Sequence, residues 1–143
     1  MIENFDHLLD AALHVRCKRV VVVFPNNKET FDAVEEASEM GLAEFILVGD
    51  EAMIHRFLNG KKDRFSNIRI VAETSMIGAL RKSIELIADG RGDILMKGGI
   101  DTSTMMRAVL QEDAGIREGK LLSDIFILEF PQRTENKFVM ITD

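Results

Sequence analysis

The hydrophobic residues of this chain follow two alternating patterns. Short, mainly apolar runs rich in β-branched residues occupy residues 19–24, 44–49, 68–71 and 93–96. Such runs are typical of strands that are buried on both faces of a sheet. Between them apolar residues recur every three or four positions, as Phe31, Val34 and Ala37 do, and this spacing predicts helices with one buried face. The alternation predicts an α/β fold of three layers, α/β/α, in which helices cover both faces of a mainly parallel sheet.

The carboxyl-terminal part of the chain departs from this alternation. Two apolar runs, residues 125–130 and 138–141, are separated by a polar segment that begins with Pro131. This arrangement resembles a hairpin more than another helical crossover, so we expect a terminal antiparallel pair. The length of 143 residues suits one domain with a substantial core, and we interpret residues 1–143 as a single α/β domain.

Composition and charge restrict the classes of partner. The net charge of −6 argues against binding to duplex nucleic acid, although a few convergent cations can still hold a phosphorylated small molecule. Cys17 is the only cysteine, so no internal disulfide can form, and the reducing cytoplasm is the simplest location. No export signal and no apolar run of membrane-spanning length is visible. We therefore expect a cytoplasmic protein that binds neither nucleic acid nor membranes.

Several common chemistries do not fit the sequence. The first apolar run is followed by Pro-Asn-Asn-Lys at residues 25–28 rather than by a glycine-rich turn, and no Walker-type spacing of glycine, lysine and hydroxyl occurs. The three histidines have no neighbours at ligand-like spacing, and Cys17 has no adjacent histidine. A nicotinamide site, a nucleoside triphosphate site, a metal site and a cysteine nucleophile are therefore all disfavoured.

One segment is a candidate for holding an anion. Lys97 and two glycines follow the fourth apolar run, and a helix is predicted over residues 102–113. The first turn of a helix offers unpaired N–H groups and the positive end of the helix dipole. The spacing of Ser103, Thr104 and Arg107 places two hydroxyl groups and a guanidinium near that helix start.

The same segment also has a purely structural interpretation. A glycine turn followed by Asp101 or Thr102 is how many helices begin. If Asp101 caps the helix, its carboxylate repels a second anion at the same place. The spacing alone leaves both interpretations open.

Several short motifs, all in the second half of the chain, carry a resemblance to a known family. They are Met-Lys-Gly-Gly at 96–99, Thr104, Met-Arg-Ala-Val-Leu at 106–110, Gly-Ile-Arg at 115–117, Gly-Lys-Leu-Leu-Ser at 119–123 and Ile-Thr-Asp at 141–143. In order and interval they resemble the phosphate acetyl/butyryltransferase family, closer to the butyryl branch. The resemblance implies a fold related to that of isocitrate and isopropylmalate dehydrogenases, with a cleft between two domains and assembly into a homodimer or another homo-oligomer.

The resemblance also implies an activity, which is transfer of an acyl group between coenzyme A and inorganic phosphate. The acyl group would be acetyl, butyryl or a branched short chain, with coenzyme A as a substrate and no tightly bound cofactor or metal. The residues that would bind phosphate or acyl phosphate are Lys97, Gly98, Thr104, Arg107 and Ser123, together with the N–H groups after Gly98. Further candidates for the cleft are Ser103, Arg117 and Asp143.

The chain departs from the family pattern in two respects. Asp124 stands where relatives of the butyryl branch often carry a histidine. Family members are also considerably longer, and the serine and aspartate that usually act near the thiol and the acyl phosphate lie in the part absent here. We therefore expect an amino-terminal part of a phosphate acyltransferase that is inactive by itself, with its catalytic residues unknown. The alternatives are a non-catalytic module that binds acyl phosphate or coenzyme A and, more weakly, a dehydrogenase-like domain.

Overall fold

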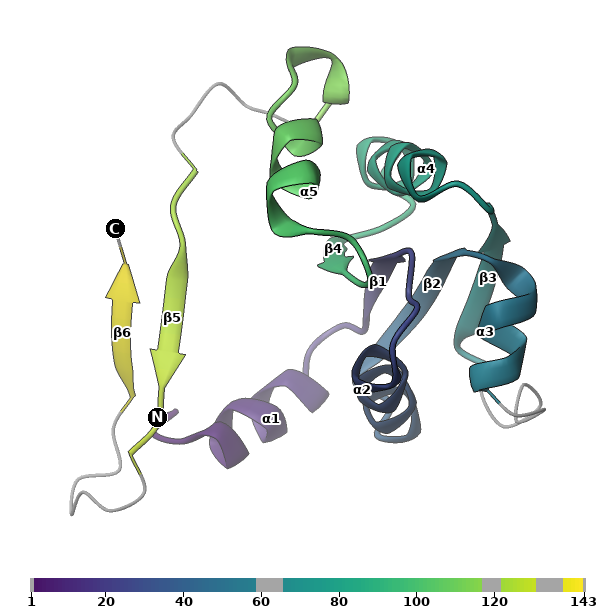
Figure 1. Ribbon diagram of the computed structural model, residues 1–143. Helices are drawn as coiled ribbons and strands as arrows, with labels where there is room; N and C mark the ends of the chain where they lie inside the picture. Colours follow the sequence, from purple (N-terminus) through teal and green to yellow (C-terminus); the bar gives the residue numbers. More distant parts are fainter. Residues whose placement is uncertain (1, 59–65, 117–121, 131–137, 143) are drawn as a thin grey trace. The chain divides into compact units, whose positions relative to one another are not determined.

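The computed structural model describes residues 2–58, 66–116, 122–130 and 138–142. The chain divides into two compact units, of which the larger is Cys17–Glu118 and the smaller combines Met1–Arg16 with Gly119–Asp143. The larger unit holds a parallel sheet with its covering helices, and the smaller holds one helix and a two-stranded sheet (Figure 1).

A four-stranded sheet forms the centre of the larger unit. Its strands are β1 (Lys18–Val23), β2 (Ala43–Gly49), β3 (Ile68–Ala72) and β4 (Ile94–Lys97). They pair in the order β3-β2-β1-β4, and every pairing is parallel. In this register Val20 lies beside Phe45 of β2 and beside Ile94 of β4. The predicted parallel sheet is confirmed, and each strand begins and ends within one residue of its predicted range.

The helices of the larger unit begin at polar caps. They are α2 (Lys28–Glu39), α3 (Glu51–Phe57), α4 (Met76–Ala88) and α5 (Thr102–Val109), and a 3₁₀ turn, η2 (Glu112–Ala114), follows α5. The side chains of Asn27, Asp50, Ser75 and Asp101 each accept the N–H of the third residue along, which satisfies one of the donors that a helix start leaves open. Among the described residues, no helix combines the length and the hydrophobicity that crossing a bilayer requires.

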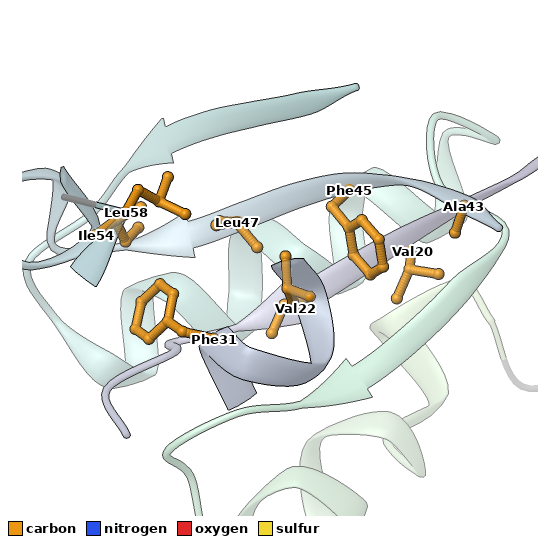
Figure 2. Close-up of a cluster of buried hydrophobic side chains, with 9 residues drawn as sticks. Val20, Val22, Phe31, Ala43, Phe45, Leu47, Ile54 and Leu58 are labelled. Atoms are coloured by element: carbon orange, nitrogen blue, oxygen red, sulfur yellow. The ribbon is translucent and has the colours of Figure 1, made fainter. Parts of the chain in front are cut away.

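Apolar side chains cover both faces of the sheet. On one face, residues of β1 and β2 such as Val22 and Leu47 pack around Phe31 of α2 and the apolar side of α3 (Figure 2). On the other face, Val21 and Ile46 pack against α4. Val21 and Val22 are both 0% exposed, and full burial of such a side chain contributes about 1.5–3 kcal/mol. The α/β/α layers predicted from the continuous valine run are therefore confirmed.

The smaller unit combines one helix with an antiparallel strand pair. These elements are α1 (Phe5–Leu13), β5 (Ile125–Leu128) and β6 (Val139–Thr142). The predicted antiparallel pair is confirmed, with Ile125 opposite Thr142, while the connecting residues 131–137 lie outside the described residues. The start of α1 contacts both ends of this connection, because the Phe5 N–H donates to Glu129 Oε2 at 2.7 Å and the Phe5 ring meets the edge of Phe138.

The strands of the smaller unit carry apolar side chains that stay exposed. Ile125 is 66% exposed and its neighbour Phe126 is 61% exposed, although successive residues of a strand point to opposite faces. Both faces of β5 therefore present apolar surface in the described structure. A two-stranded sheet without a covered face is marginally stable in water, so this unit gains little from its own core.

Candidate functional site

The strand order places a candidate site at the carboxyl ends of β1 and β4. From β1 the chain crosses through α2 to β2, whereas β4 lies on the other side of β1. Because α2 packs on one face of the sheet and α5 packs beside α4 on the other, the connections after β1 and β4 diverge (Figure 1). In open α/β sheets, ligands bind at such a switch point. Residues 25–28 and 98–101 border it.

Backbone hydrogen bonds fix the two loops at this edge to each other. The Gly98 N–H donates to the Val23 carbonyl at 3.0 Å, and the Gly99 N–H donates to the Phe24 carbonyl at 2.8 Å. Phe24 has a φ of 47°, in the left-handed region that costs an ordinary residue about 1–2 kcal/mol. Its own N–H donates to the Val48 carbonyl at 2.8 Å, which helps hold this conformation. The loop after β1 is therefore tied to β2 on one side and to the loop after β4 on the other.

Gly98 and Gly99 lie where a β-carbon would collide with the loop after β1. A β-carbon on Gly98 would overlap the Val23 carbonyl oxygen and lie 3.0 Å from Pro25 Cα, and a β-carbon on Gly99 would overlap the Asn26 side chain. Neither glycine has a positive φ. The resemblance implied that N–H groups after Gly98 hold phosphate, but the Gly99 N–H is already used by Phe24. These glycines allow two loops to approach, which is a structural role visible only in the fold.

The start of α5 already holds an anion, the carboxylate of Asp101. This side chain accepts the Thr104 N–H at 2.8 Å and the Ser103 hydroxyl at 2.6 Å. The Ser103 hydroxyl, the Thr104 hydroxyl and the Thr104 N–H, in that order, lower the pKa of Asp101 below its usual range, so the group stays ionised. The structural interpretation of this segment is therefore confirmed, and Ser103 is turned toward the cap. A second anion must bind beside a negative charge.

Thr104 and Arg107 line a groove on the α4 side of α5. The groove has a volume of about 630 Å³, and its lining also includes Arg81 but neither Lys97 nor Gly98. Neither Arg81 nor Arg107 makes an ion pair or a hydrogen bond with another described residue. Thr104 and Arg107 thus share one helix, but Arg107 lies in its last turn rather than near the start that the spacing predicted. Lys97, which is exposed, ends β4.

Arg81 was not predicted from the sequence. It follows Leu80 on α4, and an arginine beside an apolar stripe is the ordinary composition of a helix surface. Only the packing of α5 against α4 shows that it shares a groove with Arg107. The same groove carries carboxylates from Glu85, Asp89 and Asp113, so its charge is mixed.

The roles of the other predicted residues, Ser123, Arg117 and Asp143, stay predictions. Ser123 is described and exposed, and it lies in the smaller unit just before β5. Arg117 and Asp143 lie outside the described residues. In the parts of the chain that the structure describes, no group of three histidine, cysteine or acidic side chains could hold a metal ion.

The known proteins that this chain resembles in sequence are phosphate butyryltransferases and phosphate acetyltransferases. No protein-family model matches this chain. It is 34% identical over 129 residues to a phosphate butyryltransferase of Clostridium beijerinckii and 31% identical to that of Clostridium acetobutylicum, each over 90% of this chain and 43% of the relative. It is 30% identical to a phosphate acetyltransferase of Rhizobium meliloti, over 95% of this chain and 43% of that protein. The chain therefore spans less than half the length of the curated relatives it matches.

A solved structure shows the same fold. The chain superimposes on a branched-chain phosphotransacylase from Enterococcus faecalis V583 with a TM-score of 0.65 and 19% identity. The match covers 88% of this chain and 42% of that one. The resemblance found in the sequence motifs is confirmed by these relatives, over their amino-terminal half.

Proposed function

Because this chain matches the amino-terminal half of the phosphate acetyl/butyryltransferases, we propose that it is the phosphate-binding part of a phosphate acyltransferase. The reaction is acyl-coenzyme A and phosphate to coenzyme A and acyl phosphate, with a short acyl chain. The observation that carries the proposal is the position of Lys97. In a chain 34% identical to a phosphate butyryltransferase, this lysine ends β4 at the switch point of the sheet.

The reaction needs groups that stabilise negative charge. In the direction that consumes acyl phosphate, a thiolate attacks the carbonyl carbon, the carbonyl oxygen becomes an oxyanion, and phosphate leaves as the carbonyl re-forms. Lys97 and Arg107 supply positive charge to hold the phosphate, which contributes positioning and electrostatic stabilisation. The Asp101 carboxylate at the start of α5 opposes phosphate binding, so positive charge from Lys97 and Arg107 is needed to offset it.

The remaining roles in the reaction concern the other predicted residues and the base that activates the thiol. The resemblance places Ser123 near the phosphate and Arg117 and Asp143 in the cleft, and these placements stay predictions. The group that deprotonates the thiol is expected in the part of the relatives that this chain does not match. Coenzyme A is then a substrate shared with that part, and assembly into a homodimer is part of the same proposal.

Calorimetric titration with inorganic phosphate and with acetyl phosphate tests the site. Arg107→Ala and Lys97→Ala should each weaken phosphate binding by about ten- to a hundredfold, since a hydrogen bond to a charged group contributes about 1.5–3 kcal/mol. Arg91→Ala is the matched control, because this exposed arginine follows α4 near the amino ends of the strands. Unchanged phosphate affinity in a folded Arg107→Ala protein would eliminate the site.

A further inference from the structure

Asn26 lies at the candidate site but belongs to none of the sequence motifs. It follows β1, two residues after the left-handed Phe24 and directly after the buried Pro25. The strand beside β1 is β4, so Asn26 sits across from the loop that begins at Lys97. Its place in the fold is therefore the β1 side of the switch point.

The side-chain amide of Asn26 lies against Gly99. A β-carbon on Gly99 would overlap the Oδ1, Cγ and Nδ2 atoms of Asn26, so the whole amide group packs over the glycine. The backbone on both sides is fixed, because the Gly99 N–H donates to the Phe24 carbonyl at 2.8 Å. The amide thus lies next to the loop that follows Lys97.

This amide makes no hydrogen bond with another described residue, and Asn26 is exposed. Its neighbour Asn27 shows the usual use of such a residue, since its Oδ1 accepts the Thr30 N–H at 2.9 Å and caps α2. Asn26 performs no such structural task. An amide offers two N–H donors and one acceptor oxygen, and at Asn26 none of them is used by another described residue.

We propose that the Asn26 amide donates a hydrogen bond to an oxygen of the phosphoryl group bound at this edge, opposite Lys97. The inference rests on the proposed function, because it assigns a further contact within the same site. A neutral donor suits this position, since it binds a phosphoryl oxygen without changing the charge of an edge that already carries Asp101 and Lys97. Asn26 would thus be a specificity residue for the phosphoryl group.

Phosphate titration of four proteins tests this assignment: the parent, Asn26→Ala, Asn26→Asp and the control Asn27→Asp. We expect Asn26→Ala to weaken phosphate binding by about ten- to a hundredfold and Asn26→Asp to weaken it further, because a carboxylate repels phosphate. Asn27→Asp adds the same charge one residue away but keeps the helix cap, since aspartate caps as well as asparagine. It should lose much less affinity than Asn26→Asp.

Side-chain amide signals in NMR spectra provide a second measurement that needs no variant. Phosphate should shift the Asn26 amide signals more than those of Asn27. Unshifted Asn26 signals, or parent affinity in Asn26→Ala while Arg107→Ala is weakened, would overturn the Asn26 assignment and leave the proposed function standing. A parent protein that binds no phosphate would overturn both.

Discussion

Replacing either glycine of the β4–α5 turn with alanine should lower stability, and the loss should be much larger at Gly98 than at Gly99. In Gly98→Ala, the new methyl group meets only backbone atoms, namely the Val23 carbonyl oxygen and the N and Cα atoms of Pro25. Backbone cannot rotate away, so the two loops must separate and the hydrogen bond from the Gly98 N–H to Val23 is lost. Overpacking costs about 1–3 kcal/mol and a lost hydrogen bond about 0.5–1.5 kcal/mol, so we expect a loss of about 1.5–4.5 kcal/mol in the free energy of unfolding.

Gly99→Ala provides the comparison within the same turn. Its methyl group meets the side chain of Asn26, which can rotate toward solvent, so the expected loss of stability is below about 1 kcal/mol. The displaced amide should nevertheless weaken phosphate binding. Urea denaturation gives the free energies of unfolding, and calorimetric titration gives the affinities. Equal stability of Gly98→Ala and the parent would refute the close approach of the two loops on which this reasoning depends.

Two further predictions concern other parts of the chain. Hydrogen bonds from Arg19 lower the pKa of Asp93 to about 2 from 3.8, so the stability that Asp93 contributes is present above about pH 4 and is lost as the pH falls toward 2. The difference in urea midpoint between the parent and Asp93→Asn should therefore shrink as the pH falls from about 4 to about 2. A difference that stays constant over this range would contradict the prediction. The chain by itself should release no coenzyme A thiol from acetyl- or butyryl-coenzyme A in phosphate buffer, because binding of phosphate alone does not lower a barrier; turnover that Arg107→Ala abolishes would show that the catalytic residues lie within this chain.

The sequence predicted the parallel sheet because burial leaves a direct pattern in it. Val21 and Val22 point to opposite faces and are both fully buried, and their continuous run of β-branched residues indicated a strand covered on both sides. The start of α5 followed in the same local way from the cap candidates Asp101 and Thr102, whereas its end did not, because the helix stops at Val109 and a 3₁₀ turn follows within the predicted range 102–113. The turn before α5 fitted both an anion site and an ordinary helix cap, and the sequence alone could not decide between these two interpretations.

The parts of the site that the sequence missed depend on contacts between distant segments. Arg81 and Arg107 share a groove only because α4 and α5 pack together, and Asn26 meets Gly99 only because β1 and β4 are neighbours. Neither contact leaves a regular residue spacing in the sequence from which it could be predicted. Gly98 and Gly99 were noticed for their backbone N–H groups, yet their contacts with the loop after β1 explain why glycine is needed.

The carboxylate that caps α5 offers a sharp test of where phosphate binds. In Asp101→Asn, the side-chain oxygen can still accept the Thr104 N–H, so the cap and the fold should persist while one negative charge is removed. Two charges about 4 Å apart in water interact by about 1 kcal/mol, so phosphate affinity should rise about fivefold at low salt and less at high salt. Asp50→Asn is the matched control, since Asp50 caps α3 in the same way and should leave phosphate affinity unchanged. Unchanged affinity in a folded Asp101→Asn protein would show that phosphate binds away from the start of α5, and Lys97 and Arg107 would then have to act at different places.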